Sequence, residues 1–88
     1  MKTMWKYTLE VKIGPQPLQI PYSSDVLLGP HVDFQNGHLT LWVEVDTEAE
    51  AKEYVFHVFG TGWEIPPGLD RIGTATLDGY VWHVFVDE

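Results

Sequence analysis

The stretch that decides the fold is VDFQNGHLTLWVEV, residues 32–45. Apolar and polar residues alternate on both sides of Asn36-Gly37, and alternation at period two is typical of a half-buried strand. Asn-Gly between two such runs is the strongest short-range hairpin signal, because a type I′ turn needs positive φ at both central residues. The sequence therefore predicts two strands, residues 26–35 and 38–46, joined by a two-residue turn.

A two-residue turn also fixes which residues pair, so Gln35 should face His38 and Val32 should face Leu41. The apolar side chains then share one face of the hairpin. We expect that face to carry Val32, Phe34, Leu39, Leu41, Val43 and Val45, and the other to carry His31, Asp33, Thr40, Trp42 and Glu44. Pro30 lacks an N–H, which predicts that its strand is an edge strand or is bulged there.

The same patterns predict further strands on both sides of this hairpin. Residues 5–13 alternate, residues 18–20 form a brief strand, and residues 22–25 are turn-like. Residues 54–59, 71–77 and 80–86 are strands, with an irregular segment over 63–68. If Asp78-Gly79 is also a two-residue turn, Ala75 faces Trp82 and Gly73 faces Val84. The polar residues 46–53 form either one helical turn, capped by Asp46 or Thr47, or a charged loop.

Two of these strands, residues 54–59 and 80–85, share the pattern Tyr-Val-aromatic-His-Val-Phe and are apolar on both faces. Antiparallel sheets usually have one wet face, so both strands should be central and covered on both sides. With little or no helix available, the second cover is either another subunit, which predicts a homo-oligomer, or the chain closes into a barrel whose outer face is apolar in places.

Chain length, composition and net charge limit the folds and the partners that are possible. Eighty-eight residues make one domain, and 44% hydrophobic and 14% aromatic residues indicate an ordered core. We therefore predict an all-β domain over residues 1–88, an antiparallel barrel or sandwich of six or seven strands. The net charge of −8 disfavours nucleic-acid binding, which relies on Lys and Arg. No signal peptide or membrane-length apolar run is present, so we expect a cytoplasmic protein that binds no membrane.

Catalytic chemistry finds little support. There is no cysteine, and the four histidines, His31, His38, His57 and His83, lack metal-ligand spacing. The only serines, Ser23 and Ser24, have no nucleophile-elbow motif around them. We predict a protein that is not an enzyme, with no catalytic residue, no metal site and no cofactor. His57 and His83 are expected in the core.

One segment has the residue types of a ligand site: Gly60-Thr61-Gly62-Trp63, with Arg71 downstream. Glycines after a strand let successive backbone N–H groups converge on an anion. Trp63 can stack on a planar base, and Arg71, the only arginine, can bind a phosphate through two hydrogen bonds. We predict these five residues as ligand-binding. Alternatively, the two glycines only supply positive φ in a long connection.

Five motifs occur together and in order: the N-terminal Met-Lys-Thr-Met-Trp-Lys-Tyr, the strand 41–46, Phe-Gly-Thr-Gly at 59–62 with Ile65-Pro66, Ile-Gly-Thr at 72–74, and Val-Trp-His-Val-Phe at 81–85. In this the chain resembles a family of uncharacterised short proteins from bacteriophages and prophages. Members of that family usually have a longer connection before the Ile-Gly-Thr strand than the Pro66-Pro67-Gly68 present in this chain.

The resemblance implies a small accessory protein that acts in the host bacterial cytoplasm by stoichiometric binding and counters host immunity. One mode is sequestration of a nucleotide-derived signal by an oligomer, using Gly60-Thr61-Gly62-Trp63 and Arg71. An alternative is inhibition of a host defence protein through an acidic surface over residues 44–53. A third is a minor virion or assembly component.

Overall fold

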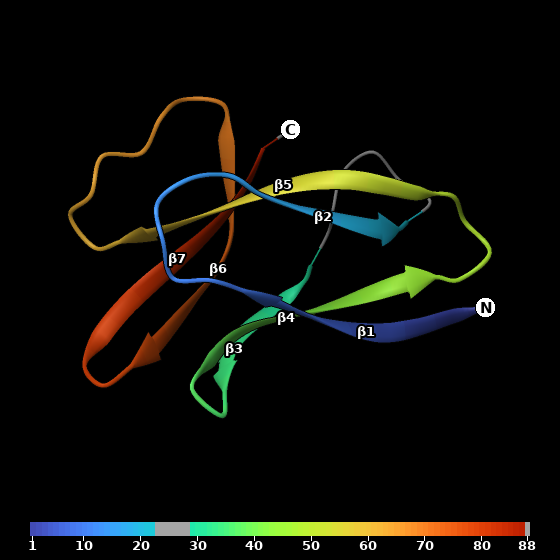
Figure 1. The fold of residues 1–88 in the computed structure, drawn as a ribbon, viewed down its shortest axis with the longest axis horizontal. Coiled ribbons are helices and arrows are strands. Elements are labelled where there is room, and N and C mark those ends of the chain that lie inside the picture. The colour runs from blue at the N-terminus through green and yellow to red at the C-terminus, as the bar shows by residue number, and fades with distance from the viewer. Residues whose placement is uncertain (23–28, 88) are drawn as a thin grey trace.

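The computed structural model describes residues 1–22 and 29–87, and these contain seven strands and no helix. The strands are β1 (Lys2–Leu9), β2 (Gln16–Pro21), β3 (His31–Gln35), β4 (His38–Asp46), β5 (Ala51–Gly60), β6 (Leu69–Leu77) and β7 (Tyr80–Asp87). They form two antiparallel sheets, β1-β4-β3 and β2-β5-β7-β6 (Figure 1). The all-β prediction is confirmed, and of the two arrangements left open the chain adopts the sandwich, not a closed barrel.

Both predicted hairpins have the predicted register. Gln35 pairs with His38 and Val32 with Leu41, while Ala75 pairs with Trp82 and Gly73 with Val84. Asn36 and Gly37 have φ of 52° and 81°, and Asp78 and Gly79 have φ of 52° and 82°. Positive φ at both central positions is what a type I′ turn requires, so the turn residues select the pairing as expected.

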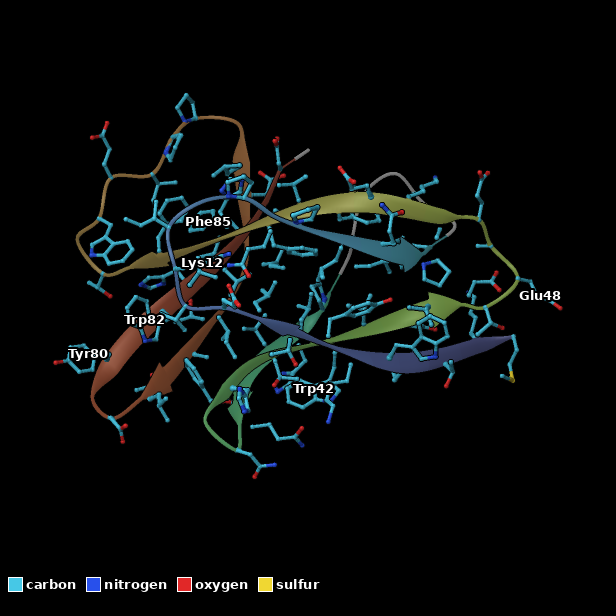
Figure 2. The ribbon with its side chains drawn as sticks, viewed as in Figure 1. Lys12, Trp42, Glu48, Tyr80, Trp82 and Phe85 are labelled. Atoms are coloured by element: carbon cyan, nitrogen blue, oxygen red, sulfur yellow. The ribbon has the colours of Figure 1, made fainter. Side chains whose placement is uncertain are left out.

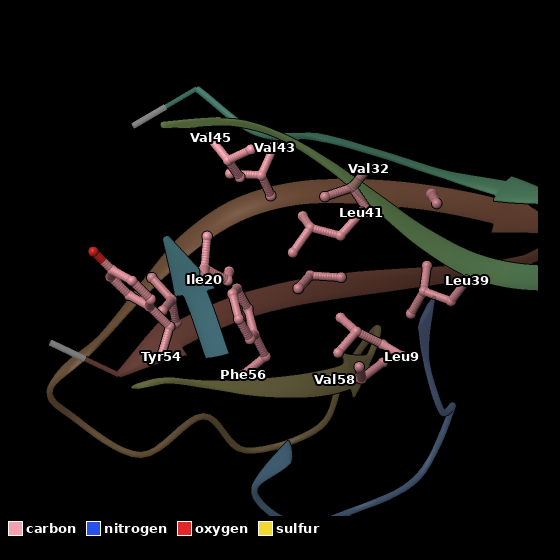
Figure 3. Packing of buried hydrophobic residues seen from close by; sticks show 13 residues of the cluster. Leu9, Ile20, Val32, Leu39, Leu41, Val43, Val45, Tyr54, Phe56 and Val58 are labelled. Atoms are coloured by element: carbon pink, nitrogen blue, oxygen red, sulfur yellow. The ribbon is translucent and has the colours of Figure 1, made fainter. Parts of the chain in front are cut away.

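The core lies between the two sheets. Leu41 and Val43 of β4 face Phe56 and Val58 of β5 across it (Figure 3), and all four side chains are buried. Burying one such side chain stabilises the fold by roughly 1.5–3 kcal/mol. The expected inner face of the first hairpin is confirmed. On its outer face Thr40 is nevertheless only 2% exposed, and its hydroxyl donates to the carbonyl of His38 at 2.9 Å.

The sheets approach closely where β3 meets β6. A Cβ built on Gly73 would lie 2.5 Å from Val32 Cγ2, closer than real Cβ contacts come. Position 73 therefore has room for no side chain while Val32 keeps its place. Val32 belongs to β3, which is an edge strand of its sheet, as the position of Pro30 predicted.

The first strand is shifted toward the N-terminus relative to the prediction. It spans Lys2–Leu9 instead of residues 5–13, and Val11 and Ile13 are 43% and 81% exposed. The chain leaves the sheet here because it must cross to the other layer, and the side chain of Gln16 stabilises the crossing. Gln16 donates to the Glu10 carbonyl and accepts from the Glu10 amide, both at 2.7 Å. The predicted strand at 18–20 is confirmed as β2.

The connection between β4 and β5 is a turn over residues 47–50, so the helical turn considered for residues 46–53 is wrong. The charged loop is right for these four residues only, because Asp46 ends β4 and β5 begins at Ala51. Asp46 stabilises this turn. Its Oδ1 accepts from the Glu48 amide at 3.1 Å, and its carbonyl accepts from the Ala49 amide at 2.9 Å. The bond from Glu48, with the N-terminal ammonium 3.5 Å away, lowers the pKa of the Asp46 carboxyl.

Two predicted features lie in the part of the chain that the structure does not describe. They are the turn-like residues 23–25 and the first three residues, 26–28, of the strand placed before Asn36. Within the described part that strand begins at His31, after Gly29 and Pro30.

The strands that are apolar on both faces are the two central strands of the larger sheet, β5 and β7, as predicted. One face packs on the core. The outer face carries half-buried His57 and Phe59 and buried Phe85, which is 8% exposed. The Phe59 and Phe85 rings meet edge to face at 5.3 Å, and His57 stacks on Phe59 at 6.2 Å. Whether a second subunit covers this aromatic row remains a prediction.

Candidate functional site

The five residues predicted to bind a ligand line one hollow of about 380 Å³. It lies where the connection between β5 and β6 meets the outer face of the four-stranded sheet. Three further residues share it, and none of the three was predicted. The hollow is lined by Gly60, Thr61, Gly62, Trp63, Ile65, Arg71, His83 and Phe85.

The glycines on either side of Thr61 have separate roles. The Trp63 amide donates to the Gly60 carbonyl at 3.2 Å, which closes a β-turn, and Gly62 within it has φ of +88°. A glycine at the third position of a type II turn supplies this conformation. The alternative interpretation of the glycines therefore holds for Gly62. The Trp63 amide, one of the groups that an anion would use, is already bonded within the turn.

Gly60 has no positive φ and serves to seat Trp63. A Cβ built on Gly60 would lie 2.9–3.3 Å from three indole atoms, Cε2, Nε1 and Cδ2, so the ring rests on the bare backbone of β5. On another side the indole meets Trp82 edge to face, with the ring centroids 5.7 Å apart. Trp63 is still 43% exposed. It is a held but accessible aromatic surface.

A chain of hydrogen bonds crosses the polar side of the hollow. Arg71 Nη1 donates to Thr74 Oγ1 at 3.1 Å, Thr74 Oγ1 bonds His83 Nδ1 at 3.1 Å, and His83 Nε2 bonds Thr61 Oγ1 at 3.0 Å. A hydroxyl can donate or accept, so either hydroxyl suits either tautomer of the ring. His83 was expected to be a core residue with one partner. It is half-buried on the outer face, with a partner for each nitrogen.

A β-bulge places Arg71 on this face. Register shifts between Arg71 and Gly73, so Arg71 pairs with Phe85 while Gly73 pairs with Val84. Arg71 and Thr74 are three residues apart, which in a regular strand means opposite faces. The extra residue brings both side chains to the outer face, where they bond each other. Bulges recur next to active sites because they redirect side chains in this way.

The guanidinium of Arg71 keeps donors free for a ligand. It has five N–H groups, of which Thr74 takes one. Within residues 1–22 and 29–87 no carboxylate forms an ion pair with it; the ion pairs found involve the N-terminal ammonium and Lys12. In a chain of net charge −8, this is a local positive site beside an exposed indole.

A second hollow, of about 520 Å³, adjoins the first and shares Gly60, Thr61 and Trp63 with it. Its other walls come from the β6–β7 turn and the start of β7. Tyr80 and Trp82 mark this place at the left of Figure 2. The remaining lining residues are Gly79, Tyr80, Val81 and Trp82, and no side chain in this lining is charged.

The acidic residues of 44–53 do not form one face. Glu44 lies on the outer face of the three-stranded sheet, and Glu53 lies in the other sheet, where it accepts from Gln19. Asp46 and Glu48 each lie 3.5 Å from the N-terminal ammonium. Figure 2 places Glu48 at the opposite end of the molecule from Tyr80. An acidic partner surface would therefore be separate from the two hollows.

The described part of the chain holds no group of three or more His, Asp or Glu residues that could bind a metal ion. It also contains no helix long and apolar enough to cross a membrane.

His31 and Asp33 lie two residues apart on the outer face of the first hairpin, and each has a separate contact there. The Asp33 carboxylate accepts from the amide of Phe34 at 2.8 Å, and His31 packs on Trp42 with the ring centroids 5.5 Å apart.

Comparison with known proteins identifies the family. The chain belongs to the family described as "Domain of unknown function (DUF7352)", whose model matches residues 1–88. No curated protein and no solved structure matches it.

Proposed function

We propose that this domain is a non-enzymatic binding protein that sequesters a small anionic ligand bearing a planar ring. The single observation that carries the proposal is that Arg71 and the exposed indole of Trp63 line the same hollow. A cation for phosphate beside an aromatic surface for a base is the pairing that a nucleotide-derived ligand needs.

The dimensions and contacts of the hollow support binding. Its volume of about 380 Å³ is within the roughly 300–1,000 Å³ range of small-molecule pockets. Base stacking on an aromatic side chain contributes ~1–3 kcal/mol. Gly60 and Trp82 hold the indole before the ligand arrives, so little ordering entropy opposes its use.

The contacts of His83 give it an orienting role in the proposed binding. Each ring nitrogen bonds a threonine hydroxyl, and the chain of bonds ends on Arg71. This arrangement suits a residue that orients the guanidinium and the Thr61 hydroxyl toward a bound anion.

For the biological setting we propose a phage-encoded accessory protein that counters host immunity by removing a nucleotide-derived signal in the bacterial cytoplasm. The supporting argument is the resemblance of its motifs to short phage proteins, together with a site suited to stoichiometric capture. A homo-oligomer that covers the outer aromatic row of His57, Phe59 and Phe85 is part of this proposal.

Calorimetry against cyclic nucleotides and ADP-ribose derivatives tests the ligand. We expect saturable heat with at least one of them. Arg71→Ala should weaken that binding by about tenfold or more, since a hydrogen-bonded charge contributes ~1.5–3 kcal/mol. The matched control is Lys6→Ala, which removes one positive charge from the outer face of the other sheet. Absence of heat for the folded protein with every compound, or equal losses in both variants, would refute the proposal.

The acidic alternative makes a different prediction. A host defence protein bound through residues such as Glu48 and Glu50 would be retained at low salt and released as salt rises, because exposed charge pairs are screened. Replacing both glutamates by glutamine should then abolish capture. Arg71→Ala should leave it unchanged.

A further inference from the structure

The two hollows differ in chemistry although they share a wall. The first offers Arg71, His83 and the Thr61 hydroxyl. The second offers aromatic and aliphatic surface from Tyr80, Val81 and Trp82, without a charged side chain. Gly60, Thr61 and Trp63 line both, so the two hollows adjoin along the end of β5 and the turn after it.

The second hollow also leaves large apolar side chains uncovered. Tyr80 is 68% exposed and Val81 36% exposed, next to the exposed indole of Trp63. Its volume of about 520 Å³ lies within the range of small-molecule sites by itself. One base and its phosphate, placed on Trp63 and Arg71, would occupy the first hollow and leave the second empty.

We infer that the ligand is a dinucleotide, with one base and the bridging phosphate in the Arg71 hollow and the second base in the hollow lined by Tyr80 and Trp82. This inference rests on the proposed function and makes it more specific. Tyr80 is then a specificity-determining residue. It contacts only the second base, and it separates two-base ligands from one-base ligands.

The test compares matched ligands on the same protein: adenosine and guanosine monophosphates against the linear and cyclic dinucleotides of the same bases. We expect a dinucleotide to bind about tenfold tighter than its mononucleotide, which corresponds to ~1.4 kcal/mol. Tyr80→Ala should remove that advantage and leave mononucleotide affinity unchanged. The exposure of Tyr80 means that the variant should fold normally, which circular dichroism checks.

Met4→Ala is the matched control, because Met4 is an exposed apolar side chain in β1, paired with Glu44 on the other sheet. It should change neither affinity. Equal affinity for the two ligand classes overturns the inference, and so does a Tyr80→Ala loss of the same size for both. In either case mononucleotide binding that depends on Arg71 would leave the proposed function intact. If no nucleotide of either class binds, the proposed function itself fails.

Discussion

The hairpins β3–β4 and β6–β7 are built on the same turn and differ in the ladders that extend from it. Asn36-Gly37 and Asp78-Gly79 have nearly identical φ values. The β3–β4 ladder runs without interruption to its last pair, whereas the β6–β7 ladder shifts register at the bulge after Arg71. The regular hairpin contributes mainly core, and the bulged one lines both hollows. A tight turn thus fixes pairing only as far as the first irregularity, and Arg71 lies beyond it.

The two hairpins also differ in which pairs face inward. The second pair from the turn is Phe34 with Leu39 in the first hairpin, and it faces the core. In the second hairpin the second pair is Thr76 with Val81, and both side chains are exposed. Its third pair, Ala75 with Trp82, faces the core instead. The turn decides which residues pair, and the apolar pattern decides which pairs are buried.

The largest effect should come from the contact that joins the hairpins. Gly73→Ala places a methyl group against Val32, whose branched side chain cannot easily rotate away. We expect a loss of about 1–3 kcal/mol in the free energy of unfolding, the usual cost of overpacking. Urea denaturation followed by circular dichroism measures it.

Gly60→Ala is the control for this prediction, because its methyl group would meet the exposed Trp63 indole instead of the core. The indole can move, so stability should change by less than about 0.5 kcal/mol. Tryptophan fluorescence and ligand affinity should change instead. Equal destabilisation by the two variants would contradict the separate roles assigned to these glycines.

A smaller effect tests whether the two turns are equivalent. Gly37→Ala and Gly79→Ala each force an alanine into left-handed backbone, at a cost of roughly 1–2 kcal/mol. Neither added methyl group meets another atom within 4 Å, so backbone conformation alone should set the loss. Thermal or urea unfolding should give similar values. Clearly unequal losses would show that the shared turn geometry is not equally important in the two hairpins.

The smallest effect separates a structural hydroxyl from a functional one. Thr40→Val, in β4, removes the buried bond to the His38 carbonyl and should cost about 0.5–1.5 kcal/mol. Thr74→Val, in β6, removes the exposed bonds to Arg71 and His83, and should cost less than about 0.5 kcal/mol. Calorimetry should show weakened ligand binding only for Thr74→Val. The reverse pattern would contradict the roles assigned to both hairpins.

Local chemistry made most of the fold predictable. The two turns, the registers next to them and the central placement of β5 and β7 all follow from residues adjacent in sequence. The predictions that were wrong depend on distant parts of the chain. Residues 10–13 continue the apolar alternation of β1, but the crossing between the sheets takes them out of the ladder.

The candidate site was partly predictable for the same reason. Gly60 to Trp63 are contiguous, and residue type alone singled out Arg71. Extending the register of the Asp78-Gly79 turn would place Arg71 opposite buried Val86, and only the bulge turns it outward. His83 was assigned to the core because its strand is apolar on both faces. Its threonine partners come from two other parts of the chain, and no local pattern points to them.

Those partners make His83 a cross-link between two parts of the chain. One ring nitrogen bonds Thr61, in the connection that carries Trp63, and the other bonds Thr74, the residue that holds Arg71. The single imidazole therefore ties the aromatic and the cationic sides of the hollow to each other, and a side chain with one polar atom at position 83 would release one of them.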